Sequence, residues 1–300
     1  MIIQTDNLQK AFNKFEALRG LNMSVPEGSV FAVIGANGAG KTTLIKVLMN
    51  LIRPTAGSAT VLGVSSLALS PRERSRIGYV SENLEMPGRL TVGQYISYLR
   101  PFYATWDRQF EQAVLQQLRL PMGRRINELS HGMRLKMALA CALPFRPDLL
   151  VLDEPFSGLD QLIREEFMEQ VLVHADEMTV LISSHELSEI EGSVTHVAYI
   201  EQGRLLFQQG MEELSARVRE VRVTLNETAT VRAGLPAHWL RVNAAGSVLS
   251  FVDIRYDQEQ LAEQISTHLR RIDDVKVTPV SLSAIFTTLA RAAQNGTLPT

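Results

Sequence analysis

A glycine-rich loop between an apolar run and a helix-forming run constrains the fold more than any other stretch of this chain. The apolar residues Val30–Ile34 come first, and Leu44–Met49 come last. Between them stand Gly35, Ala36, Asn37, Gly38, Ala39, Gly40, Lys41, Thr42 and Thr43. A strand, the spacing G-x-x-x-x-G-K-[ST] and a helix are together typical of a phosphate-binding loop. We therefore expect these residues to bind the phosphate groups of a nucleotide.

The residue types in the loop support this prediction. Its glycines let the backbone curl so that N–H groups point inward, and the following helix adds the positive end of its dipole. Lys41 is expected to reach the β- and γ-phosphates, with the Thr42 hydroxyl on Mg²⁺. The alternative is a glycine-rich turn that binds nothing, and it is disfavoured because strand, spacing, lysine and threonine all agree.

Further apolar runs predict an α/β fold. Leu149–Leu152 and Val180–Ile182 are short and almost continuously apolar, and a helical pattern separates them. Such strands belong to a mainly parallel sheet that is covered on both faces. The alternation in residues 21–25 predicts a half-exposed antiparallel strand, which is part of a small β-layer beside the loop.

The stretch between the loop and Leu149 is rich in helix formers. Thr91 and Gln94 have the spacing of a capping box. The helix that they open carries Tyr95, Tyr98, Leu99 and Phe102 at helical spacing. We expect most of this stripe to be core, with its outer aromatic side chains as a docking surface for a partner.

Composition sets broad limits on the class of protein. A chain of 300 residues favours one large domain and a smaller one. The formal net charge of −2 gives no reason to expect a nucleic-acid partner. The single cysteine, Cys141, and an N-terminus without a signal-peptide pattern predict a cytoplasmic protein. No stretch reaches the ~20 apolar residues that cross a bilayer.

Two adjacent carboxylates follow the strand Leu149–Leu152. Ligands bind at the carboxyl ends of strands in open α/β sheets, so Asp153 and Glu154 are candidate site residues. Asp153 suits Mg²⁺ ligation through water, and Glu154 suits polarising the water that attacks a phosphoryl group. An acidic turn with no function fits these two residues equally well when they are considered alone.

Later motifs identify a family. Leu129-Ser130-His131-Gly132-Met133 and the alanine-rich helix after it resemble the signature of the ABC (ATP-binding cassette) ATPases. The chain also contains residues that match the other motifs of that family, in the same order along the sequence: Phe12, Asp153-Glu154-Pro155, Ser157-Gly158-Leu159-Asp160 and His185. The resemblance covers residues 1 to about 214. It implies a P-loop NTPase of ABC type, with a mixed, mainly parallel sheet, an antiparallel β-layer and a helical subdomain at about 88–143.

The resemblance also implies residue roles. Phe12 is expected to stack on adenine, and His185 to contact the γ-phosphate and position water or Glu154. Ser130 and Gly132 open a helix N-terminus, which in the family caps the γ-phosphate held by a second subunit. Asp160 belongs to the adjoining D-loop. One loop and one signature in a chain imply a head-to-tail dimer around ATP and Mg²⁺.

Two positions depart from the family pattern. Glu82 stands where the family commonly has glutamine; it keeps an oxygen for Mg²⁺ but adds a negative charge. In the signature, His131 replaces a glycine and Met133 replaces the usual glutamine. Both changes resemble variants among bacterial exporter ATPases, and we interpret them as subfamily features.

The sequence therefore predicts the ATPase subunit of a bacterial ABC exporter. It would lie at the inner face of the cell membrane and drive separate transmembrane permease subunits through the region Glu82–Phe102. Two alternatives remain: an ABC ATPase that acts on ribosomes or DNA, and an ATP-gated dimer switch with little hydrolysis. The pattern of residues 215–300 predicts a small α+β domain, and its sequence indicates no function. The transported substrate is not encoded in this chain.

Overall fold

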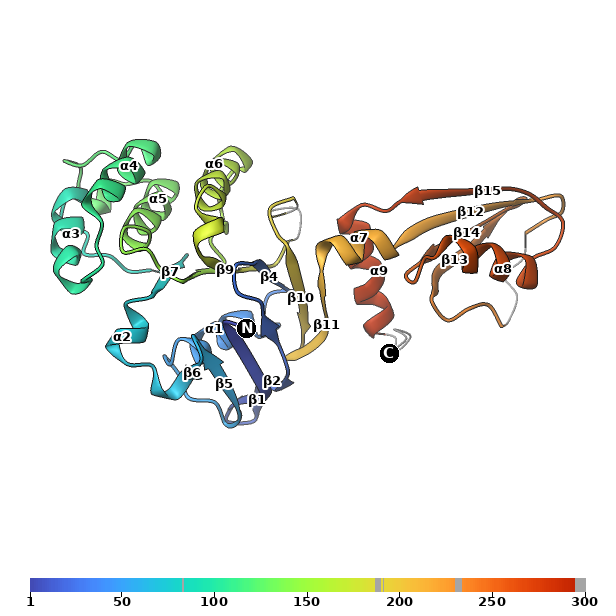
Figure 1. Ribbon diagram of the computed structural model, residues 1–300, viewed down its shortest axis with the longest axis horizontal. Helices are drawn as coiled ribbons and strands as arrows, with labels where there is room; N and C mark the ends of the chain where they lie inside the picture. Colours follow the sequence, from blue (N-terminus) through green and yellow to red (C-terminus); the bar gives the residue numbers. More distant parts are fainter. Residues whose placement is uncertain (83, 187–189, 191, 230–233, 295–300) are drawn as a thin grey trace. The chain divides into compact units, whose positions relative to one another are not determined.

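The chain folds into two compact units, Met1–Gln208 and Gln209–Thr300 (Figure 1). The computed structural model describes residues 1–82, 84–186, 190, 192–229 and 234–294. Each unit has its own sheets and its own hydrophobic core.

A six-stranded sheet forms the centre of the first unit, in the order β11-β10-β4-β9-β8-β7. Its strands are β4 (Val30–Ile34), β7 (Ile77–Ser81), β8 (Leu149–Asp153), β9 (Thr179–Ser184), β10 (His196–Glu201) and β11 (Arg204–Gly210). The pairs from β10 to β7 are all parallel. This confirms the mainly parallel sheet, and its strands β8 and β9 are buried along their whole length, as continuous apolar runs require.

An antiparallel sheet accompanies it. Its strands are β1 (Ile3–Phe12), β2 (Phe15–Leu21), β3 (Ser24–Val25), β5 (Ala56–Val61) and β6 (Val64–Ser65). The predicted β-layer is therefore present, but residues 21–25 do not form one strand: β2 ends at Leu21, and β3 begins at Ser24. Both β2 and β3 pair with β1 on the side opposite β5, so the chain continues along the same side of β1 after this break.

Helix α1 (Lys41–Leu48) joins the two sheets through one hydrophobic core. That core includes Ile3 of β1, Phe31 of β4, Leu44 and Leu48 of α1, and Val151 of β8. Because these side chains are almost fully buried, they fix the start of α1 relative to the strands that carry the candidate site.

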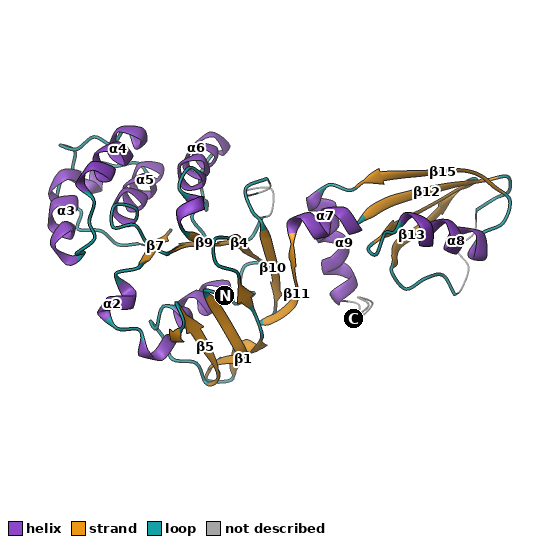
Figure 2. Cartoon of the chain, viewed as in Figure 1, coloured by secondary structure: helices purple, strands orange, loops and turns teal. Residues whose placement is uncertain are grey.

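Helices gather at one end of the first unit. Figure 2 shows α3 (Val92–Leu99), α4 (Arg108–Leu118) and α5 (His131–Ala142) grouped together, with α5 packed against β7. The unit also holds α2 (Pro71–Arg74) and α6 (Gln161–Leu172). The predicted capping box is confirmed, because the Thr91 hydroxyl accepts from the N–H of Gln94 and the Gln94 side chain accepts from the N–H of Thr91.

The aromatic stripe of α3 is not core. Val92 and Ile96 are the buried residues of this helix, whereas Tyr98 is 57% exposed and Phe102 is 64% exposed. The expectation that most of the stripe is buried was wrong, because the side chains of Val92 and Ile96, four residues apart, define the inward face instead. Tyr98 and Phe102 contact each other edge to face, with ring centroids 5.3 Å apart.

The second unit is an antiparallel four-stranded sheet with helices. The sheet has the order β13-β14-β12-β15. Its elements are α7 (Met211–Arg217), β12 (Arg219–Leu225), β13 (Trp239–Ala245), β14 (Val248–Asp253), α8 (Gln258–His268), β15 (Ile272–Pro279) and α9 (Leu282–Gln294). Trp239 stacks on Phe251 at 4.0 Å in its core. Strand β13 was not predicted from the sequence.

No helix among the described residues is both long and apolar enough to cross a membrane.

An ion pair between Arg100 and the buried Glu111 links the turn after α3 to α4 and gives a pH-dependent prediction. Glu111 is 3% exposed and accepts from the Arg100 guanidinium at 2.6 and 2.7 Å and from Trp106 Nε1 at 2.7 Å. Burial raises the pKa of Glu111, but the bonds from Arg100 and Trp106 outweigh it, so the pKa lies below its ordinary value of 4.5. The ionised carboxylate therefore stabilises the fold above that value, and this contribution is lost as the pH falls through the lowered pKa.

We expect Glu111→Gln to lower the free energy of unfolding by about 2 kcal/mol at pH 7, measured by urea denaturation. The difference in the free energy of unfolding between Glu111→Gln and the unmodified protein should shrink below pH 4.5. Glu177→Gln is the matched control: this side chain is 62% exposed, and its pair with Arg146 should contribute little. Equal losses of unfolding free energy from both substitutions would contradict the stabilising role assigned to the Glu111 carboxylate.

Candidate active site

The predicted loop connects β4 to α1 and has the backbone that its glycines allow. Gly38 has φ 83° and Gly40 has φ 111°, in the left-handed region. A Cβ atom on Gly40 would lie 2.6 Å from the carbonyl oxygen of Ala17, so only glycine fits there. The N–H of Gly35 donates to the carbonyl of Ser184 at 3.3 Å, which fixes the start of the loop to β9.

Lys41, the first residue of α1, is buried and surrounded by oxygen atoms. Its Nζ donates to the carbonyl oxygens of Gly35 at 2.6 Å and Ala36 at 3.2 Å, and it lies 2.8 Å from Glu154 Oε1. The side chain is 3% exposed. An ammonium group has three donors, and these contacts use all of them. An anion that enters the loop must therefore take the place of at least one partner.

Asp153 ends β8 and is held by two hydroxyl groups. Ser183 Oγ donates to its Oδ1 at 2.9 Å, and Thr42 Oγ1 donates to the same oxygen at 3.2 Å. Burial raises the pKa of Asp153, and both hydrogen bonds oppose that rise. The hydroxyl of the loop threonine and the strand-end carboxylate, predicted from stretches far apart in the sequence, are thus in direct contact.

Glu154 and His185 form the other side of the site. His185 Nδ1 lies 3.0 Å from Glu154 Oε2, while Lys41 contacts the second carboxylate oxygen. Burial raises the pKa of Glu154, but the hydrogen bonds from His185 and Lys41 outweigh it, so the pKa lies below its ordinary value. Glu154 also has φ 48°, a left-handed conformation that is rare for this residue type.

Ser183 is a site residue that the sequence did not reveal. Its hydroxyl donates to Asp153 and accepts from the N–H of Glu154 at 2.9 Å, so one fully buried side chain orients both acidic residues. The motif before His185 contains this serine, but nothing in the motif says that β8 and β9 are neighbours.

The signature residues start α5. Ser130 is the N-cap, and its hydroxyl accepts from the N–H of Met133 at 3.3 Å. Gly132 packs against α6, because a Cβ there would lie 3.0 Å from Ile163 Cγ2. His131 Nε2 lies 3.1 Å from the carbonyl oxygen of Ser157, in the segment that follows Glu154.

The remaining predicted site residues lie around the group formed by Lys41, Asp153 and Glu154. Asp160 caps α6 by accepting from the N–H of Ile163 at 3.0 Å. Phe12 ends β1, is 46% exposed and has Lys10 Nζ 4.9 Å from its ring centroid. Glu82 is exposed, and its N–H donates to the carbonyl of Asp153 at 3.3 Å.

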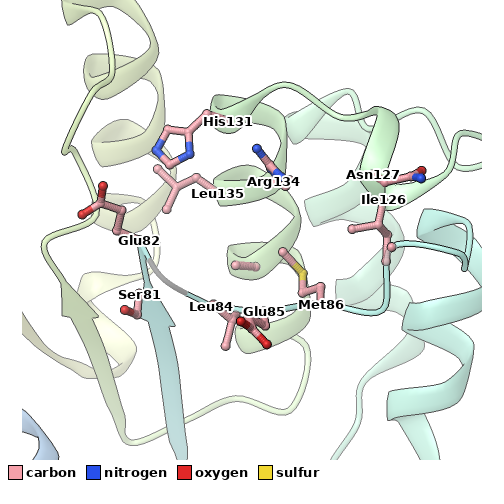
Figure 3. A pocket seen from close by; sticks show the side chains of 12 residues that line it. Ser81, Glu82, Leu84, Glu85, Met86, Ile126, Asn127, His131, Arg134 and Leu135 are labelled. Atoms are coloured by element: carbon pink, nitrogen blue, oxygen red, sulfur yellow. The ribbon is translucent and has the colours of Figure 1, made fainter.

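A cavity of about 520 Å³ lies between the segment after β7 and α5 (Figure 3). Its lining includes Glu82, Glu85, His131 and Arg134, so it joins the position expected to bind Mg²⁺ to the signature helix.

The structure thus brings together Lys41, Thr42, Asp153, Glu154 and His185. Among the described residues, no hydrogen bond or ion pair joins Ser130 or Gly132 to the loop. The described part of the chain also contains no cluster of three or more His, Cys, Asp or Glu side chains that could hold a metal.

We expect Ser183→Ala to lower the free energy of unfolding by about 2 kcal/mol, because it removes the buried hydroxyl that serves a carboxylate and a backbone N–H. Urea denaturation measures this loss. Ser58→Ala, at an exposed position on β5, is the control and should change stability by less than ~0.5 kcal/mol. If the two variants are equally stable, Ser183 does not have the orienting role assigned here.

Comparison with known proteins identifies the family. A family model described as "ABC transporter" matches residues 18–157. "Probable multidrug ABC transporter ATP-binding protein YbhF" of Escherichia coli (strain K12) is 31% identical over 222 residues, which are 72% of this chain and 38% of YbhF. This chain therefore spans well under half the length of that relative.

Two further proteins match over most of their own length. The ATP-binding cassette MJ0796 was solved as a dimer bound to ADP and Pi. It matches this chain with a TM-score of 0.62 at 21% identity, and the match covers 70% of this chain and 98% of MJ0796. That likeness shows the fold. "Bacitracin transport ATP-binding protein BcrA" of Bacillus licheniformis is 33% identical over 226 residues, 73% of each chain. With motifs, fold and relatives in agreement, this chain belongs to the family of ABC transporter ATP-binding proteins.

Proposed function

We propose that this chain is the ATP-hydrolysing subunit of an ABC exporter. The observation that carries the proposal is the contact of Lys41 with Glu154, which places a phosphate-binding cation against a candidate general base. Export is favoured by relatives whose names refer to bacitracin transport and multidrug transport.

The charges of the site suit a phosphoryl transfer. Phosphate oxygens in the loop compete with Glu154 for Lys41, because its three donors are already used. Once Lys41 turns to the phosphates, Glu154 loses one contact that lowers its pKa, so the pKa rises from its lowered position while the hydrogen bond from His185 still opposes the effect of burial. His185 retains its contact with Glu154 Oε2 and holds the carboxylate in place.

The residues fit Mg²⁺ as the cofactor. Thr42 Oγ1 and Asp153 Oδ1 lie 3.2 Å apart and offer the oxygen ligands that this cation prefers. Glu82, whose N–H donates to the carbonyl of Asp153 at 3.3 Å, is the third proposed ligand. Bound there, Mg²⁺ would neutralise charge on the β- and γ-phosphates.

We also propose that the site is completed by a second copy of the chain. The N-terminus of α5 attracts anions, with Ser130 and Gly132 at its first turn, yet no hydrogen bond or ion pair between described residues joins them to the loop of their own chain. A two-fold, head-to-tail dimer places them over the nucleotide of the partner. Phe12 provides an exposed ring for adenine, and Asp160 lies beside the signature through α6.

Separate transmembrane subunits are the proposed partners, with this chain at the inner face of the membrane. The exposed pair Tyr98 and Phe102 supplies an apolar contact surface on α3 and the turn after it. The net charge of −2 supports no nucleic-acid partner. Residues 1–214 would be the catalytic cassette, and residues 215–300 a domain with a separate role.

We expect Glu154→Gln to abolish at least about 99% of ATP hydrolysis while ATP binding persists, because it removes the base and keeps the shape of the side chain. Steady-state phosphate release measures the rate, and light scattering with MgATP should detect an accumulated dimer. Glu165→Gln, an exposed glutamate on α6, is the control and should keep full activity. Equal, negligible rates in the unmodified and Glu154→Gln proteins, even with the membrane partner present, would favour an ATP-gated switch.

An affinity pull-down from detergent-solubilised membranes tests the transport assignment. A polytopic membrane protein should co-purify with the tagged chain. Recovery should fall several-fold for Phe102→Asp, which places a charge in the exposed aromatic pair. Recovery of ribosomes or DNA in place of a membrane protein would contradict the proposal.

A further inference from the structure

The second unit carries an open strand edge beside an apolar groove. Strand β15 is the last strand of its sheet, and among the described residues no other strand pairs with its outer side. Figure 1 shows it along the upper border of this unit, with α8 below it. A groove of about 480 Å³ runs between the two elements.

Most of the groove's lining consists of apolar side chains of both elements. They are Leu261, Ala262 and Ile265 of α8, and Ile272, Val275 and Val277 of β15; Tyr256 and Gln258 complete the lining. Val275 is opposite Val223 and Val277 is opposite Val221 on β12, and both β12 residues are fully buried. The apolar face of the sheet therefore continues onto β15, where Val275 is 39% exposed.

The other face of β15 carries charges of opposite sign. Asp274 and Lys276 are exposed, and neither forms an ion pair with another described residue. Lys276 lies opposite Arg222 of β12, and Arg222 forms its own ion pair with Glu220 at 3.0 Å. A carboxylate on the outer side of Lys276 would give this lysine the partner that it lacks among the described residues.

We propose that β15 pairs with β15 of a second copy and joins two four-stranded sheets into one. A two-fold axis perpendicular to the joined sheet keeps the apolar faces of both copies on the same side. Residues that face each other across the pair must then point to the same face, so the axis passes between the two copies of one residue. Centring on Asp274 or on Lys276 sets like charges opposite each other. Centring on Val275 sets Asp274 opposite Lys276 twice, which is the only complementary arrangement of these three.

The same register suits the groove. The two Val275 side chains meet at the axis on the apolar face, and the grooves of both copies face each other across the joined strands. Charged residues on an edge usually prevent pairing with unrelated strands. Here Asp274 and Lys276 disfavour pairing with other strands and in other registers. They permit self-association, because the register centred on Val275 sets each aspartate opposite a lysine of the other copy.

The interface uses no residue of the nucleotide site. It therefore goes beyond the proposed ATPase function, and the two can fail independently. Dimerisation through β15 requires no ATP, whereas the proposed nucleotide sandwich does.

Disulfide cross-linking tests the register. The only native cysteine, Cys141, is first removed by Cys141→Ser. Val275→Cys in the full chain should then give a disulfide-linked dimer under a mild oxidant without nucleotide. Residues that face each other across an antiparallel pair have Cα atoms ~4.5–5.5 Å apart, within disulfide range. Asp273→Cys is the matched control on the same strand: its two copies would lie ~13 Å apart and should not link.

A charge exchange tests the complementarity. In the Val275→Cys background, Asp274→Lys alone and Lys276→Asp alone should each lower the cross-linking yield about five-fold, and the two changes together should restore it. Lys41→Ala should leave the yield unchanged, which separates this interface from the ATP-dependent one. Absence of a linked dimer, equal yields from positions 273 and 275, or no recovery in the doubly exchanged protein would overturn the proposal.

Discussion

The ion pair between Lys41 and Glu154 is the interaction on which the site depends. Both side chains are largely buried, so each needs the other to remain charged at low cost. Lys41 begins α1, and Glu154 follows β8. The pair therefore ties the phosphate loop to the acidic strand end, and it orients the carboxylate that His185 contacts from its other oxygen. In the proposed mechanism, phosphate at the loop would compete with Glu154 for Lys41 and so remove one contact that lowers the pKa of Glu154.

The order of strands explains why residues distant in sequence meet. β9 lies between β4 and β8, with Ser184 opposite Ile34 and Ser183 opposite Asp153. The carboxyl ends of three parallel strands thus present the loop, the serine pair and the two acidic residues at one edge. The core around α1 holds the loop against this edge.

Much of this arrangement could be predicted from the sequence, because it is encoded in consecutive residues. The loop of residues 35–43, the strand before Asp153 and the capping box at Thr91 each carry a local pattern. The role of Ser183 could not be predicted, since it depends on which strands are neighbours. The stripe with Tyr98 was assigned to the core because helical spacing identifies a face but not which face is buried. Strand β13 was missed because Arg241 and Asn243 interrupt its apolar pattern.

The central claim is that each chain holds half of a nucleotide site, and mixing two inactive variants tests it most directly. Lys41→Ala damages the loop half, and Ser130→Glu damages the signature half. In a head-to-tail dimer, a mixed pair retains one site built from two unaltered halves. An equal mixture should therefore recover about a quarter of the unmodified ATPase rate, while each variant alone stays inactive. A mixture no more active than its components would contradict the account.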